Sequence, residues 1–167
     1  MITTTLNRIR AHSPCQVGWE KLLNGLGKKK ADDERLPFSR IVEINGINDA
    51  LWCCRVEPQY EREWRLFAVA CVRRIQHLMK DPRSIDALDV AERFANGEAT
   101  DEELVAAGDA AGAAWAASAA AGDAARGAWV AAGAAAGAAG AARAAEREWQ
   151  TQEFIRVVNA EAQKGAE

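Results

Sequence analysis

A run of alanine and glycine near the C-terminus constrains the fold more than any other feature of this sequence. Residues 104–145 contain 25 Ala and 7 Gly among 42 positions. Alanine has the highest helix propensity, so this segment is expected to be helical. Each interior glycine costs about 1 kcal/mol relative to alanine, so seven of them would cost about 7 kcal/mol, comparable to the stability of a small domain. Either close packing offsets that cost, or the segment forms two helices with a break near Gly122 or Gly133.

The alanine-rich run also contains a tandem repeat. Gly108, Trp115, Gly122 and Trp129 follow one another at intervals of seven residues, and residues 108–121 match residues 122–135 at nine of 14 positions. The repeat places a stripe of small residues along a helix, with a Trp at every fourteenth position. Small residues allow another helix to approach closely, and the Trp rings fill the space where the backbones diverge.

This stripe has three interpretations. In the first it is the contact face of a closely packed helix pair, formed with the helix expected around residues 64–79 or by the run folding back on itself. In the second it is a surface for a protein partner or for self-association, with the Trp rings as anchors. In the third the repeat arose by slippage in alanine-coding DNA and was merely tolerated.

The remaining segments also predict helices. A helix is expected to start at Ser13-Pro14, with Ser13 as N-cap, and to stop at Gly27. Further helices are expected over residues 38–44, closed by Gly46, and from residue 48 to about 56. An apolar stripe of Trp64, Phe67, Ala68, Cys71, Val72, Ile75, Leu78 and Met79 predicts a helix over residues 61–79. Another is expected from Ser84 to Gly97, and the capping box Thr100–Glu103 opens the alanine-rich segment.

No segment alternates apolar and polar residues as a strand does. The sequence therefore predicts an all-α fold, a compact bundle of about six or seven helices with a long Ala/Gly-rich C-terminal helix or helical hairpin. One domain is expected over residues 1–167, made of N-terminal helices (1–46), core helices (47–97) and the alanine-rich helical region (98–160).

Charge and composition exclude several classes of protein. The net charge of -3 and pI of about 5.5 argue against a nucleic-acid-binding protein, which usually carries a basic face. The alanine-rich run lacks Leu, Ile and Phe and carries charged residues, so no membrane span is expected. The first residues lack the apolar core of a secretory signal, and with four cysteines this predicts reduced thiols in the cytoplasm. The charged stretch 28–37 is expected to be a solvated loop, with Lys28, Lys29 and Lys30 as an alternative basic patch.

Few residues are suited to catalysis or metal binding. The two histidines, His12 and His77, lack the paired spacing of a zinc site, and Cys71 falls on an apolar stripe where a thiol is usually a core residue. The acidic residues cluster at helix ends or on solvent-facing positions. No phosphate-binding loop or hydrolase motif is present in the sequence. We therefore expect no enzyme activity, no metal and no cofactor.

The middle of the chain resembles a known type of protein. The motifs are Leu51-Trp52-Cys53, Trp64-Arg65-Leu66-Phe67-Ala68 with Cys71, Asp81-Pro82-Arg83-Ser84, Ala91-Glu92-Arg93-Phe94-Ala95 and Gly97. Over residues 48–145 they resemble an Ala-rich helical family of bacteria and their phages, which has no known function. More distantly, they are similar to predicted immunity proteins of bacterial polymorphic toxin systems. That resemblance implies binding and neutralisation of a toxin.

Together these observations predict a non-enzymatic protein that binds another protein and blocks it sterically. The partner would be a toxin or a host defence complex, and the latter includes counter-defence by a phage, such as an anti-CRISPR. Trp115 and Trp129 are the expected anchors, with Asp109, Asp123 and Arg126 as charges at the rim. The alternative is a self-associating structural protein whose Ala/Gly face forms a homodimer.

Overall fold

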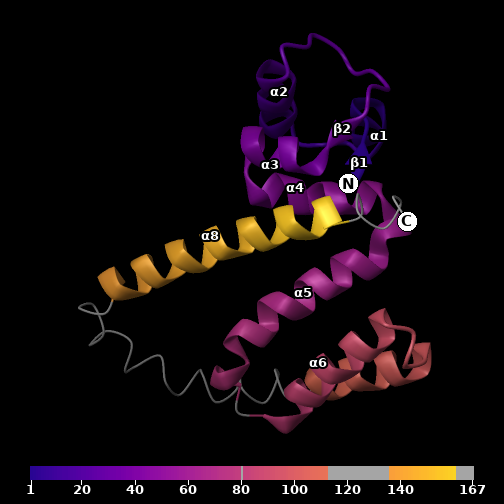
Figure 1. Cartoon of the computed structure of the whole chain (residues 1–167), viewed down its shortest axis with the longest axis vertical. Coiled ribbons are helices and arrows are strands. Elements are labelled where there is room, and N and C mark those ends of the chain that lie inside the picture. The colour runs from indigo at the N-terminus through magenta and orange to yellow at the C-terminus, as the bar shows by residue number, and fades with distance from the viewer. Residues whose placement is uncertain (80, 113–135, 161–167) are drawn as a thin grey trace. The chain divides into compact units, whose positions relative to one another are not determined.

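The structure is a computed structural model that describes residues 1–79, 81–112 and 136–160 (Figure 1). Over these residues the fold is all-α, with one short strand pairing. The elements are β1 (Thr3–Thr4), α1 (Leu6–Ala11), α2 (Gln16–Gly25), β2 (Leu36–Pro37), α3 (Phe38–Asn45), α4 (Ile47–Cys53), η1 (Cys54–Val56), η2 (Pro58–Tyr60), α5 (Glu61–Ile75), η3 (Gln76–Leu78), α6 (Pro82–Ala95) and α8 (Ala136–Ala160). Residues 101–112 are also helical. The predicted fold class is confirmed.

The chain divides into two compact units. The first contains the residues up to Trp64 and the C-terminal part of α8 from Arg147 onward, and the second contains the residues from Arg65 to Glu146. Each unit is described by itself below. The expectation of a single domain stays a prediction.

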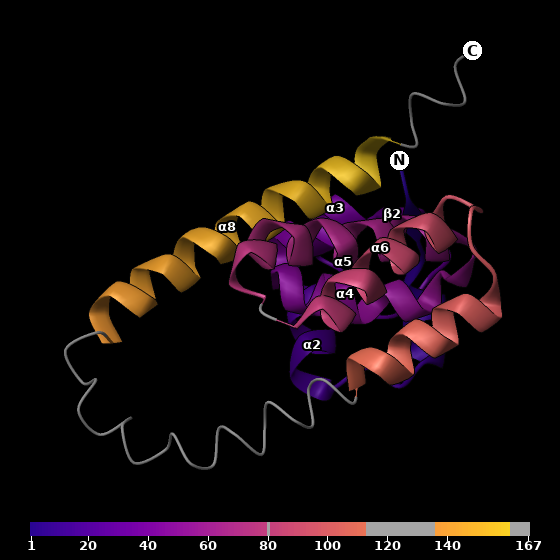
Figure 2. The ribbon, with the colours of Figure 1, turned by 90° about the horizontal axis from the view of Figure 1, so that it is seen from below.

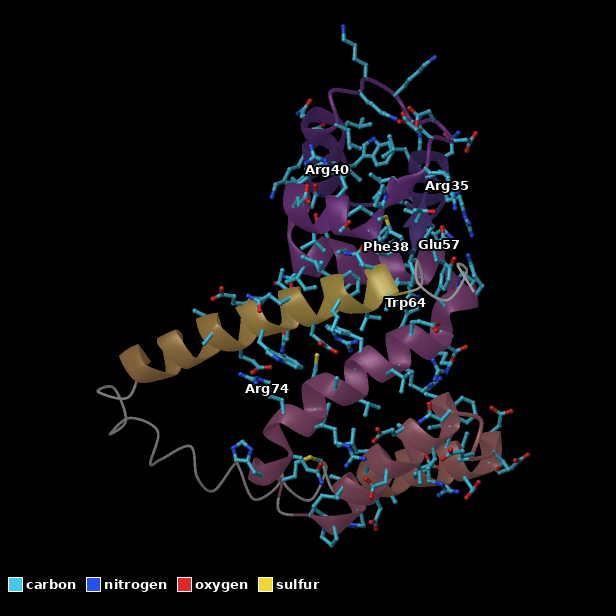
Figure 3. The ribbon with its side chains drawn as sticks, viewed as in Figure 1. Arg35, Phe38, Arg40, Glu57, Trp64 and Arg74 are labelled. Atoms are coloured by element: carbon cyan, nitrogen blue, oxygen red, sulfur yellow. The ribbon has the colours of Figure 1, made fainter. Side chains whose placement is uncertain are left out.

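The core of the first unit is built around three aromatic rings. Phe38 and Phe154 are both 0% exposed. The ring of Phe154 stacks on Trp64 with centroids 5.9 Å apart and lies 6.2 Å from the ring of Phe38 (Figure 3). Aliphatic side chains complete this core, namely Ile2, Leu6, Ile9, Ile41 and Val158. Residues at the two ends of the chain therefore share one core.

The N-terminus is tied to this core by backbone hydrogen bonds. The amide of Ile2 donates to the carbonyl of Val158 at 2.6 Å, so the first residues lie beside the end of α8 (Figure 2). The amide of Phe38 donates to the carbonyl of Ile2 at 3.3 Å. Strand β1 pairs antiparallel with β2, with Thr4 opposite Leu36. A pairing of two residues is too short for an alternating pattern of apolar and polar residues, so it cannot be predicted from the sequence.

The second unit contains α5, α6 and the helix of residues 101–112. Arg73 of α5 pairs with Asp89 and Glu92 of α6, in each case at 2.6 Å from its Nη2. The guanidinium of Arg65 lies 4.8 Å from the centroid of the Phe94 ring. Ion pairs and a cation–π contact therefore join α5 to α6.

Several predicted helix ends differ from the structure by two to four residues. Helix α2 is capped by the side chain of Cys15, which accepts the amide of Gly18, and not by Ser13. Ser13 has a left-handed backbone with φ +54°, whereas an N-cap residue is extended, as Cys15 is with φ -63° and ψ 144°. Helix α6 begins at Pro82, with Asp81 as N-cap, and not at Ser84. Proline fits the first helical position because its missing N–H has no partner there in any helix.

Other local predictions are confirmed. The amide of Thr100 donates to the Glu103 carboxylate at 2.8 Å, and the amide of Glu103 donates to the Thr100 hydroxyl at 3.2 Å, which is the predicted capping box. Gly46 ends α3 with φ +92°. The expected apolar stripe on α5 is only partly right, because Phe67 is buried but Ala68 is exposed and Val69 is buried instead. Residues two apart lie on opposite sides of a helix, so α5 is covered on two sides.

Candidate functional site

The predicted binding residues fall in two groups. Asp109 lies in the helix of residues 101–112 and is exposed. Trp115, Asp123, Arg126 and Trp129 lie outside the described residues. The expected anchoring role of the two Trp residues, and the stripe that joins them, therefore stays a prediction.

The helix that carries Asp109 presents a face with three acidic residues and two apolar ones. A shallow hollow on it is lined by Asp101, Glu102, Val105, Ala106 and Asp109, and Val105 is 63% exposed. Hydrogen bonds from the helix N-terminus and from Thr100 lower the pKa of the Glu102 carboxyl. The Glu102 carboxylate of this face is therefore charged at neutral pH.

The buried thiols are poorly suited to nucleophilic chemistry. Burial raises the pKa of Cys53 to about 12, and it raises the pKa of Cys54 to about 12 as well. A thiolate is the reactive form of cysteine, and at neutral pH these two side chains remain thiols. Cys15, in contrast, is exposed at the start of α2. His12 and His77 are also exposed.

No metal site is visible in the described part of the chain. Among residues 1–79, 81–112 and 136–160, no group of three or more His, Cys, Asp or Glu side chains is arranged to hold an ion.

The concave site of the first unit is an apolar cavity of about 190 Å³ at α2, α3 and α4. Two tryptophans line it, Trp19 from α2 and Trp52 from α4, and both are half-buried. The apolar wall also includes Ile9, Leu22, Ile41 and Cys53, and the polar wall includes Cys15, Asn45, Asn48 and Asp49. A cavity of this size and lining accepts one aromatic ring, because an engineered apolar cavity of about 150 Å³ binds benzene.

The polar wall of the cavity is held by one asparagine. The Nδ2 of Asn45 donates to the carbonyl of Gly18 at 2.8 Å and to the Oδ2 of Asp49 at 2.7 Å. This links α2, α3 and α4 at the cavity. A Cβ at Gly18 would stand 2.8 Å from the Oδ2 of Asp49 and 3.1 Å from the Sγ of Cys15. Glycine is therefore needed at this point of α2 for the carboxylate to lie where it does.

A second hollow, here called the basic groove, adjoins the cavity. It is open, with a volume of about 490 Å³, and it is lined by Arg10, Ser13, Pro14, Gln16, Trp19, Leu23, Lys29, Lys30 and Ala31. Pro14 and Trp19 line both the groove and the cavity. Pro14 and Trp19 therefore stand at the border between the two hollows.

The lysines of the loop after α2 have different partners. The Nζ of Lys28 lies 2.7 Å from Asp32 and 2.6 Å from Glu34, and the hydrogen bonds to these carboxylates raise its pKa. Lys29 and Lys30 are exposed and form no ion pair with a described residue. The loop predicted over residues 28–37 is present over residues 28–35, but Leu36 and Pro37 form β2 and Leu36 is buried, because it packs into the core of the first unit. Two of the three lysines belong to the groove.

Sequence reasoning missed the cavity and the groove. Helical periodicity places Trp19 on one face with Leu22, and Trp52 belongs to the Leu51-Trp52-Cys53 motif, but their shared wall depends on how α2 meets α4. The triple lysine was the one available signal for the groove, and it was read mainly as a loop. Arg10, which completes the basic lining, has no pattern that connects it to residues 29–30.

No described helix is both long enough and apolar enough to cross a membrane. No protein-family model matches the chain, and no curated protein or solved structure is significantly similar to it.

Proposed function

We propose that this chain is a non-enzymatic inhibitor or immunity-type protein, which binds another protein and blocks it by steric occlusion. The observation that carries the proposal is the cavity between α2 and α4, which is apolar, open at the surface and lined by two tryptophans. Binding energy at protein interfaces is concentrated in a few large side chains that enter such pockets. The cavity would take one anchoring side chain of the partner.

Exposed apolar residues on the same two helices support this proposal. Val17 of α2 is 79% exposed and Leu51 of α4 is 38% exposed. Each is adjacent in sequence to a residue that lines the cavity, Gly18 and Trp52 respectively. Exposed apolar side chains near a pocket are a feature of protein interaction surfaces.

The remaining predicted contacts extend the same proposal. Asp109 on the acidic helix, with Trp115, Asp123, Arg126 and Trp129, would form a further contact with the partner. We propose the toxin or the host defence complex as the target, from the resemblance to the immunity proteins. Occlusion needs no turnover, so one molecule of this chain would block one molecule of its partner.

The first test blocks the cavity through Cys15, which lines it and is exposed. The chain is treated with N-benzylmaleimide, immobilised and used to capture proteins from a bacterial lysate. The matched control is Cys15→Ser given the same treatment, because any modification of other thiols is common to both proteins. We expect the control to retain a partner at one-to-one stoichiometry and the alkylated wild type to lose it at least tenfold. Equal capture by both would refute docking at this cavity.

A second measurement distinguishes occlusion from catalysis. The captured partner is titrated with the chain, and the partner's own activity is followed. Steric inhibition predicts a linear loss that ends at one equivalent. Complete inactivation by much less than one equivalent would show turnover, and the non-enzymatic proposal would be wrong.

A further inference from the structure

We infer that the cavity and the basic groove are one composite site for an acidic peptide segment that presents a tryptophan or tyrosine. The aromatic side chain would enter the cavity, and the flanking carboxylates would lie in the groove. This inference rests on the proposed function, because the segment belongs to the protein partner.

The continuity of the two hollows is the first argument. The ring of Trp19 and the ring of Pro14 line both of them. A residue seated in the cavity is therefore followed along its own chain by residues that pass over Trp19 into the groove. Successive residues of an extended peptide are about 3.3 Å apart, so the residues next to the anchor in sequence are the ones that would lie in the groove.

Charge complementarity is the second argument. The groove is lined by three cations, Arg10, Lys29 and Lys30, and by no carboxylate. None of the three forms an ion pair with a described residue, whereas their neighbour Lys28 is held by Asp32 and Glu34. The hydrogen bond from Lys28 lowers the pKa of the Asp32 carboxyl, and the charge of Lys30 helps to lower it. The loop thus neutralises one lysine and leaves the groove positive. Carboxylates of a partner are the complementary groups, and they also accelerate association.

The wall of the cavity specifies the anchor. The Oδ2 of Asp49 accepts from Asn45, and its Oδ1 has no hydrogen bond with a described residue. The Oδ1 of Asn45 is buried and also has no partner among the described residues. The Oδ1 of Asp49 is therefore the acceptor that these two side chains offer to the cavity, because the Oδ1 of Asn45 is covered and both side-chain N–H groups of Asn45 are already used. An indole N–H or a phenol O–H supplies a donor together with an apolar ring, which an aliphatic side chain does not.

A nucleic acid is the less favoured occupant. A base could stack on Trp19 with its phosphates near the cations. However, the groove provides only three cations, and the whole chain carries a net charge of -3, which repels a long polyanion. The acceptor Asp49 in the cavity wall adds a negative charge where the base would lie.

The test uses three fluorescein-labelled peptides and the full chain. The peptides are Glu-Glu-Trp-Glu-Glu, its charge-reversed form Lys-Lys-Trp-Lys-Lys, and Glu-Glu-Ala-Glu-Glu, each with a blocked C-terminus. Dissociation constants are measured by fluorescence anisotropy at low salt and at physiological salt. We expect the first peptide to bind at least tenfold more tightly than the second and at least fivefold more tightly than the third. Its affinity should weaken as salt rises.

Matched variants locate the binding. Lys29→Glu should lower the affinity for the first peptide at least fivefold, whereas Arg35→Glu should change that affinity less than twofold. Arg35 is an exposed cation of the same loop that does not line the groove, so both variants change the net charge equally (Figure 3). Circular dichroism of both variants checks that the helices are retained.

Several results would overturn the inference. The first is that the acidic tryptophan peptide does not bind at concentrations up to millimolar. The second is that the charge-reversed peptide binds with equal affinity, and the third is that Lys29→Glu and Arg35→Glu have equal effects. Tighter binding of an eight-nucleotide oligothymidine than of the acidic peptide would assign the groove to nucleic acid instead. Failure here is distinguishable from failure of the proposed function. If alkylation of Cys15 abolishes partner capture but Lys29→Glu does not affect it, the partner docks at the cavity. The inference that an acidic segment of the partner lies in the groove is then refuted.

Discussion

Replacement of Phe154 by alanine tests how the C-terminal part of α8 is held in the first unit. Phe154 is 0% exposed, and its ring meets Trp64 at 5.9 Å and Phe38 at 6.2 Å between centroids. It lies 90 residues further along the chain than Trp64 and 116 residues further than Phe38. The substitution therefore removes a ring that joins segments far apart in sequence.

The expected loss of stability follows from the size of the cavity that remains. Phe→Ala changes in protein cores cost about 3–5 kcal/mol. Two aromatic partners and complete burial place Phe154 toward the upper part of that range, at about 4 kcal/mol. Proteins of this size are stable by about 5–15 kcal/mol, so a large share would be lost. With a urea m value of about 2 kcal/mol/M, the midpoint should fall by about 2 M.

The assay is urea denaturation followed by tryptophan fluorescence and by far-UV circular dichroism. Trp64 contacts the deleted ring and reports on this core directly. Gln152→Ala is the control, because this residue is exposed on the same helix and its replacement should change stability by less than about 0.5 kcal/mol. A fall of the midpoint by less than about 0.5 M for Phe154→Ala would refute the packing of α8 into this core.

Two further predictions concern close packing and thiol chemistry. Gly25→Ala would place a Cβ 2.4 Å from the Cγ2 of Ile44, so we expect a destabilisation of about 1–2 kcal/mol by urea denaturation, despite the better helix propensity of alanine. A neutral or stabilising effect would show that α2 and α3 are less closely packed at Gly25 than this 2.4 Å approach implies. With a pKa of about 12, Cys53 and Cys54 carry about one thiolate in ten thousand at pH 8, so an alkylating reagent should modify exposed Cys15 much faster. Mass spectrometry of digests checks the order, and equal rates at Cys15 and Cys53 would contradict the burial.

The helices were predictable because their signals are local. The capping box of Thr100 and Glu103, the termination at Gly46 and the solvated loop after α2 each depend on residues within a few positions of one another. The ends of α2 and α6 were misplaced by two residues because two neighbouring side chains could each cap the helix. At α6 the proline follows its cap and occupies the first helical position, whereas at α2 it precedes the cap, so the proline rule alone selects the right cap for α6 and the wrong one for α2.

The cavity could not be predicted in the same way. Its walls come from α1, α2, α3 and α4 and from the turn before α2. Hydrophobic periodicity indicates that Trp19 and Leu22 share a face, but it does not say which residues of α4 lie opposite. The hydrogen bonds of Asn45 to Gly18 and Asp49 set that arrangement, and they join residues up to 27 positions apart.

The amino-acid sequence by itself determined the all-α class, most of the helices and the charged loop, because helix propensity, capping and termination act over a few residues. Only the tertiary structure decided that the start of the chain and the end of α8 share a core, that α2 and α4 enclose an apolar cavity, and that Arg10 joins Lys29 and Lys30 in one groove. Each of these features depends on contacts between segments that are distant in the sequence. The packing of whole side chains sets the geometry of such contacts, and it produces no periodic pattern in the sequence.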